Sequence, residues 1–115
     1  MEIRNSKFTH STTKVFCEDY RKYNAPNHFI VKDTDDNEIC KIDFQEGPIK
    51  ECGINGVSNE DLLLMILTRL ESFQASPYKC NENQEAIIAI NEAVDSLRKR
   101  TNNRINRGVE GTNEV

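Results

Sequence analysis

Residues 57–107 constrain the fold most, because their apolar side chains recur at the three- and four-residue spacings of α-helices. Ser58 is a favourable N-cap, and Asp61 stands where it can complete a capping box. The helix that begins here should run to about Gln74, and it is apolar nearly all round at first. So wide an apolar face predicts that this helix is covered on more than one side.

A second helix is expected after the turn 75–80, which contains a proline. Asn81 can cap this helix, with Gln84 at the capping-box position. Its apolar residues share one face: Ala86, Ile87, Ile90, Ala93, Val94 and Leu97. The helix should continue to Gly108, a favourable C-terminal stop. Residues 57–107 therefore predict a helical hairpin whose second helix extends past the core with a basic end.

Residues 1–56 carry the patterns of β-strands. The segments 28–33 and 38–44 are rich in β-branched and aromatic residues, and the polar stretch 34–37 between them is typical of a hairpin turn. Weaker strand patterns cover 13–17 and 48–52.

The strand 38–44 indicates how the sheet is exposed. Cys40, Ile42 and Phe44 share one face because strand side chains alternate. One buried and one partly exposed face is the behaviour of an antiparallel sheet. The expected fold class is α+β, with an N-terminal antiparallel β-sheet followed by a C-terminal two-helix hairpin. We expect one domain, 1–115, that ends in a glycine-bounded tail at 108–115.

The charge of the chain is distributed unevenly. The formal charge is −4, yet the segment from Ser96 to Val109 holds five positive residues and no negative one, so the rest is near −9. Long DNA or RNA is not expected as a partner, because such binding needs a broad basic surface. No apolar run is long enough for a signal core or a membrane span, so we expect no membrane partner and a cytoplasmic location.

Signatures of metal sites and enzymes are missing from the sequence. Its four cysteines form no C-x-x-C pair and have no histidine at ligand spacing, which favours buried free thiols over a zinc site. We find no phosphate-binding glycine loop, no H-E-x-x-H and no nucleophile elbow. His10 and His28 are interpreted as surface or loop residues. The chain is therefore expected to be neither an enzyme nor a holder of a cofactor or metal.

Three arginines near the end of the second helix have two interpretations. Arg100, Arg104 and Arg107 stack on one helical face, with Asn103 beside them. Cations at a helix C-terminus complement the macrodipole and keep the surface soluble. Alternatively, guanidinium groups without interleaved acids suit bidentate contacts with a diphosphate or a small phosphodiester ring.

The tail and the hairpin turn also leave alternatives open. The tail around Gly108 and Gly111 can fold back over something that the arginines hold, or it can fray. Phe73 suits the helical core, and also suits stacking on a base. Asn83 usually helps to cap a helix, and it can also read a base edge.

The second half of the chain carries four motifs: N-G-V-x-N-E-D-L-L at 55–63, S-F-Q-A at 72–75, C-x-E-N at 80–83 and R-T-x-x-R-x-x-R-G-V-E-G-T at 100–112. Together these motifs span about half of the chain. In them the chain resembles a helical-hairpin domain shared by phage anti-CBASS and anti-Thoeris proteins. With its strand-rich first half, the chain is similar to the first described type of phage Thoeris anti-defence protein.

The resemblance implies a sponge. Proteins of this family bind and sequester glycocyclic ADP-ribose, an immune signal made from NAD, without cleaving it, in the host bacterial cytoplasm. Some members also bind cyclic di- or trinucleotides at separate sites of a hexamer. The implied fold is an antiparallel sheet followed by two helices, and the implied assembly is a homo-oligomer, a dimer or a trimer of dimers.

The resemblance also assigns roles to individual residues. Phe73 is implied to stack on the ligand, and Asn83 to bond with it. Arg100 and Arg104 are implied to hold the pyrophosphate. Arg107 and Thr112 are implied to lie near a phosphate at one of the two site types. The chain departs from the family pattern beside the turn proline, with Ser76 before it and Tyr78 after it.

Two other hypotheses remain open at this stage. The hairpin can be an oligomerisation or interaction module whose basic end binds an acidic partner or nucleic acid. A small phosphodiesterase acting on the same ligands is a further alternative, although no base, nucleophile or metal cluster is visible in the sequence.

Overall fold

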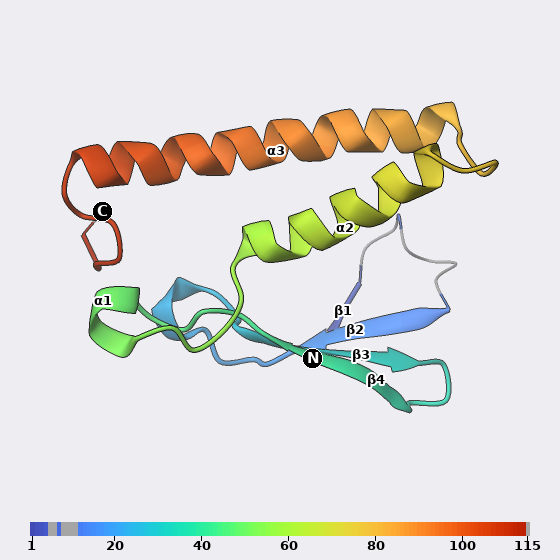
Figure 1. Ribbon diagram of the computed structural model, residues 1–115. Helices are drawn as coiled ribbons and strands as arrows, with labels where there is room; N and C mark the ends of the chain where they lie inside the picture. The colour runs from blue at the N-terminus through green and yellow to red at the C-terminus, as the bar shows by residue number, and fades with distance from the viewer. Residues whose placement is uncertain (5–6, 8–11, 115) are drawn as a thin grey trace. The chain divides into compact units, whose positions relative to one another are not determined.

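The computed structural model describes residues 1–4, 7 and 12–114. It divides the chain into two compact units, Met1–Val57 and Ser58–Val115, and each is described by itself (Figure 1). The first unit is a β-sheet with a short 3₁₀ helix (Lys22–Asn24) and a short α-helix, and the second unit is a helical hairpin. The α+β class and the order of sheet before hairpin are confirmed. His10 lies outside the described residues.

The sheet has four strands in the order β1-β2-β3-β4, and every neighbouring pair is antiparallel. Its strands are β1 (Glu2–Ile3), β2 (Thr13–Cys17), β3 (His28–Asp33) and β4 (Glu38–Asp43). The expected strands at 13–17 and 28–33 are confirmed, and that at 38–44 ends one residue earlier than expected. The two-residue β1 was not predicted, because its polar surroundings give no strand pattern.

The turn between β3 and β4 is held by the carboxylate of Asp33. It accepts hydrogen bonds from the backbone N–H of Asn37 at 2.9 Å, from the side-chain amide of Asn37 at 3.1 Å and from the backbone N–H of Asp35 at 2.9 Å. The N–H groups of Asn37, foremost its backbone one, lower the pKa of Asp33. The predicted turn at 34–37 is therefore confirmed.

The expected burial on β4 is only partly correct. Ile42 and Phe44 are half-buried, and the ring of Phe44 packs edge-on against Phe29 with centroids 5.4 Å apart. Cys40 is exposed. It lies on β4, which is an edge strand of the sheet, and it directly follows the irregularity between Glu38 and Cys40 in the β3–β4 pair.

The expectation of buried thiols holds for one cysteine only. All four are free, but Cys17 alone is buried, while Cys40, Cys52 and Cys80 are exposed. The exposed three lie on an edge strand, at the end of a one-turn helix and at a helix N-cap, where neighbouring side chains cannot enclose them.

The predicted strand at 48–52 is wrong. Ile49–Cys52 is a one-turn helix, α1, after the extended Pro48, and it ends at Gly53 with φ 71°. Two side-chain amides close the loop around it. Gln45 Nε2 donates to the Gly53 carbonyl at 2.8 Å, and Asn55 Nδ2 donates to the Glu46 carbonyl at 2.8 Å. These local hydrogen bonds provide partners for backbone carbonyl groups, so the segment does not need a neighbouring strand.

The hairpin consists of α2 (Asn59–Gln74) and α3 (Asn81–Asn106), which pack against each other and run in opposite directions (Figure 1). The predicted capping box is confirmed, since Asp61 N–H donates to Ser58 Oγ at 3.2 Å and Ser58 N–H donates to Asp61 Oδ2 at 2.9 Å. The second cap differs from expectation. Cys80 is the N-cap, and its sulfur accepts from the N–H of Asn83 at 3.4 Å, so α3 includes Asn81.

Gly56 lies where two backbone segments of the first unit approach each other closely. The backbone of Phe44 pairs with that of Val57, which presses Gly56 against the chain. A Cβ at Gly56 would lie 2.5 Å from the Phe44 carbonyl oxygen and 2.7 Å from that of Asp43. We expect Gly56→Ala to reduce the free energy of unfolding by about 3 kcal/mol, because backbone atoms cannot move aside as a flexible side chain does. Urea denaturation followed by circular dichroism measures this loss.

Gly53→Ala is the matched control. Gly53 combines φ 71° with ψ −179° and has open space around its Cβ position, so backbone strain alone, about 2 kcal/mol, is expected. A loss at Gly56 no larger than that at Gly53 would contradict the close approach.

His28 predicts a pH dependence of the first unit. Its Nδ1 lies 2.7 Å from Asp43 Oδ1 and its Nε2 lies 3.4 Å from Glu46 Oε2. The hydrogen bond with Asp43, aided by the charges of Glu18 and Glu46, raises the pKa of His28. The contribution of protonated His28 to the free energy of unfolding is therefore complete at pH values below its unfolded pKa of about 6.5. This contribution is lost as the pH rises through the pKa of His28 in the folded state. We expect His28→Gln to lower the urea midpoint more at pH 5.5 than at pH 9. Equal losses at the two pH values would refute this assignment.

Candidate functional site

The C-terminal end of α3 is closed by a Schellman motif. Gly108 has φ 72°, and its N–H donates to the Ile105 carbonyl at 3.0 Å. The N–H of Val109 donates to the Arg104 carbonyl, also at 3.0 Å. These two bonds satisfy helix-terminal carbonyls, and the left-handed backbone suits glycine. The prediction that Gly108 ends the helix is confirmed.

After Gly108 the chain folds back, which is one of the two alternatives that the sequence left open. Val109–Thr112 forms a turn in which the Thr112 N–H donates to the Val109 carbonyl at 3.1 Å, with Gly111 at φ 79°. The Thr112 hydroxyl also donates to the Val109 carbonyl, and accepts from the Glu114 N–H at 3.2 Å. The tail 109–114 is thus built from its own hydrogen bonds.

Arg104 holds this tail. It is only 8% exposed, although it is charged. Its Nη1 donates to the Glu114 carbonyl at 2.7 Å, and its Nη2 donates to the carbonyls of Val109 at 2.9 Å and Thr112 at 3.2 Å. A buried guanidinium needs this many partners, because desolvation of an unpaired charge is very costly.

Glu110 is the acidic partner of Arg104. Its Oε2 lies 3.6 Å from Arg104 Nε, and its Oε1 accepts from the Gly111 N–H at 3.1 Å. The side chain of Arg104 is 10% exposed and that of Glu110 is 37% exposed, so the pair is partly shielded from water. Glu110 therefore compensates part of the positive charge at the helix end.

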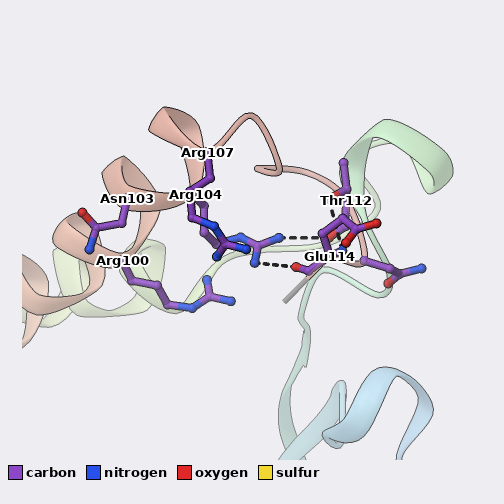
Figure 2. A pocket seen from close by; sticks show the side chains of 7 residues that line it. Arg100, Asn103, Arg104, Arg107, Thr112 and Glu114 are labelled. Carbon is purple, nitrogen blue, oxygen red and sulfur yellow. Dashed lines mark hydrogen bonds between the residues drawn. The ribbon is translucent and has the colours of Figure 1, made fainter.

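A pocket of about 450 Å³ lies between the last turns of α3 and the tail. It is lined by Arg100, Asn103, Arg104, Arg107, Thr112, Asn113 and Glu114. Figure 2 shows the three arginine side chains extending from α3 on the side of the tail, as the predicted stacking on one helical face requires. Guanidinium groups gathered in this way can bind an anion by paired, charge-assisted hydrogen bonds.

The pocket contains residues that sequence reasoning missed. Asn113 and Glu114 line it only because the turn at Glu110 and Gly111 brings the tail back. The two glycines of the tail were the signal for such a turn. Nothing in the sequence indicated that Arg104 itself holds the tail.

Phe73 and Asn83 lie at the opposite end of the hairpin. Phe73 is 41% exposed near the end of α2, with the guanidinium of Arg69 5.6 Å from its ring centroid. Asn83 is in the first turn of α3, where its backbone N–H completes the cap. At about 1.5 Å per residue, Asn83 and Arg104 are about 30 Å apart along α3. Within one chain, the pocket therefore contains Arg100, Arg104, Arg107 and Thr112. Phe73 and Asn83 lie outside it, at the other end of the hairpin.

Two further observations bear on the chemistry of the chain. Within residues 1–4, 7 and 12–114, no group of three or more His, Cys, Asp or Glu side chains is placed to hold a metal ion. Over the same residues, each helix is too short or too polar to span a lipid bilayer.

Comparisons with known proteins agree with this architecture. Residues 36–101, more than half of the chain, match the family model of the Acb2/Tad1 hairpin domain. The chain is also 37% identical to a protein named Thoeris anti-defense 1 from Bacillus phage SBSphiJ7, in a match that covers 98% of each chain. The C-terminal hairpin that carries the basic pocket is therefore that of the Acb2/Tad1 family, to which this chain belongs.

Proposed function

We propose that the chain is a non-catalytic sponge that binds glycocyclic ADP-ribose and so inhibits Thoeris immunity in the cytoplasm of a host bacterium. The observation that carries this proposal is the pocket of about 450 Å³ with three arginines along one wall. The 37% identity to a Thoeris anti-defence protein, which extends over nearly the whole chain, also supports the proposal.

The chemistry of the pocket suits a pyrophosphate. Its volume lies in the range of small-molecule sites, about 300–1,000 Å³. Arg100 is exposed on α3, and among the described residues no carboxylate pairs with it. Its guanidinium can therefore turn toward a phosphate and form two parallel hydrogen bonds. A bound anion would also relieve the repulsion between arginines three and four positions apart.

We propose the following roles for the site residues. Arg100 and Arg104 bind the pyrophosphate, Phe73 stacks on the ligand and Asn83 bonds with it. Arg107 and Thr112 lie near a phosphate at one of two site types, the second of which would take cyclic di- or trinucleotides. Sequestration requires tight binding alone, so none of these residues needs to act as a base or a nucleophile.

The distance of about 30 Å along α3 between Asn83 and Arg104 favours a site shared by two copies of the chain. If two hairpins pair with their α3 helices antiparallel, the turn end of one meets the basic end of the other. Each pair would then form two equivalent sites, as two-fold symmetry requires. A hexamer, formed from three such pairs, remains part of the proposal.

The surface of α2 supports association between copies. None of its residues is buried, and Leu64, Met65 and Ile66 are 61%, 56% and 47% exposed. Three consecutive apolar residues at this exposure are typical of a surface that meets another protein. We propose that this surface contributes to the homo-oligomer.

The second candidate function is an interaction module, in which the hairpin oligomerises and the basic end binds an acidic protein or a nucleic acid. The exposed apolar residues of α2 favour it equally. Tests of nucleotide binding separate the two candidates, because only the sponge needs the pocket for a small ligand.

We expect Arg100→Ala to weaken the affinity for glycocyclic ADP-ribose by about ten- to hundredfold, because a charge-assisted hydrogen bond to the phosphate is lost. Lys99→Ala is the matched control. It removes the same charge from the neighbouring position, which does not line the pocket, so an effect within about twofold is expected. Isothermal titration calorimetry measures both variants.

The wild-type protein should also remove glycocyclic ADP-ribose from solution and release it intact after heat denaturation. Recovery of a cleaved product would reveal an enzyme instead. Full affinity in the Arg100→Ala and Arg104→Ala variants would favour the interaction module.

A mixing experiment tests whether two copies share the site. Phe73→Ala and Arg100→Ala chains should each bind poorly, but a refolded mixture of both should regain about a quarter of the wild-type binding capacity. Random pairing makes half of the pairs mixed, and each mixed pair has one intact site and one doubly defective site. Capacity is measured by titration under tight-binding conditions. If the mixture binds no better than its components, the site belongs to one chain.

A further inference from the structure

We propose that Glu110 is a positioning residue, which fixes the guanidinium of Arg104 and the tail 109–114 in the arrangement that lines the basic pocket. This inference rests on the proposed function, because it assigns to Glu110 a share of the affinity for a phosphate-bearing ligand. It starts from an acidic side chain placed against an anion site.

The geometry of Glu110 is suited to this role. Its Oε1 accepts from the N–H of Gly111 at 3.1 Å, so the carboxylate is tied to its own turn. Its Oε2 lies 3.6 Å from Arg104 Nε. That oxygen is buried and accepts no hydrogen bond from the described residues, so the nearby charge of Arg104 is what stabilises it there.

The opposite side of the guanidinium is fixed by the tail. Three of the five N–H groups of Arg104 donate to the carbonyls of Val109, Thr112 and Glu114. With Glu110 beside Nε, the planar group is held from both ends and cannot rotate without breaking several contacts. Arg104 nevertheless lines the pocket, so its charge remains available there.

Fixing Arg104 in advance favours ligand binding. A free arginine side chain loses much rotamer freedom when it binds an anion, and this loss reduces affinity. Here the structure has ordered the side chain before the ligand arrives. The tail carries Thr112 and Asn113 to the same pocket, so a loosened Arg104 would also displace them.

Glu114 distinguishes positioning from simple repulsion. It also lines the pocket, but only its backbone contacts Arg104, and its carboxylate has no partner among the described residues. Both acids repel an anion through space, yet only Glu110 orients an arginine. Neutralising the two acids should therefore change the affinity in opposite directions.

The experiment compares Glu110→Gln with Glu114→Gln, which alter charge with little change in shape, in the full-length protein titrated with glycocyclic ADP-ribose. We expect Glu110→Gln to bind roughly tenfold more weakly, because Arg104 must then be ordered during binding. Glu114→Gln should bind about two- to threefold more tightly, because only repulsion is removed. Unchanged or tighter binding by Glu110→Gln would overturn the proposal.

Two further measurements separate positioning from a general structural defect. In an Arg104→Ala background, Glu110→Gln should change the affinity by less than about twofold, because its effect passes through Arg104. Full additivity of the two losses would overturn the proposal. In the ligand-free protein, hydrogen exchange of the tail amides should be faster in Glu110→Gln, while that of α2 stays unchanged.

The exchange measurement also separates this inference from the proposed function. If the wild-type protein fails to bind glycocyclic ADP-ribose, the sponge proposal is wrong, whatever the tail does. If the wild-type protein binds but tail exchange is identical in Glu110→Gln, the sponge stands and the positioning role is overturned.

Discussion

The buried guanidinium of Arg104 is the interaction on which the basic end of the hairpin depends. Three tail carbonyls and one carboxylate surround it, and the glycine at φ 72° allows the chain to turn back toward it. A charge at this depth is tolerated only with such partners. The tail is therefore part of the pocket wall rather than an appendage, and Thr112 reaches the pocket through it.

The length of α3 sets the second constraint. A helix of 26 residues places its basic end far from the turn of the hairpin, and few residues of the hairpin are buried. A pocket at one end and an aromatic ring at the other can serve one ligand only if copies associate. The exposed apolar residues of α2 offer a surface for the association that we propose. The candidate site, the proposed oligomer and the sponge proposal are thus linked by the length of α3.

Local patterns predicted most of the fold. The capping box at Ser58 and Asp61, the turn held by Asp33 and the glycine stop at 108 all depend on contacts within a few residues, so the sequence contains them directly. Predictions that depended on distant neighbours were less accurate. The segment 48–52 has a strand-like composition, but side-chain amides from Gln45 and Asn55 close it into a loop around one helical turn. Burial of the thiols also failed as a prediction, because exposure depends on strand order and edges.

The α+β class, the two helices and the arginine face can be predicted from the amino-acid sequence, because periodicity and capping are local properties of the chain. The sequence also carried the family resemblance in its motifs. The three-dimensional fold was needed to show that the tail folds back, that Arg104 is buried against it and that Glu110 lies beside the guanidinium. The physical reason is that spacing places side chains on a face, whereas the partners of a buried charge depend on where the rest of the chain returns in space.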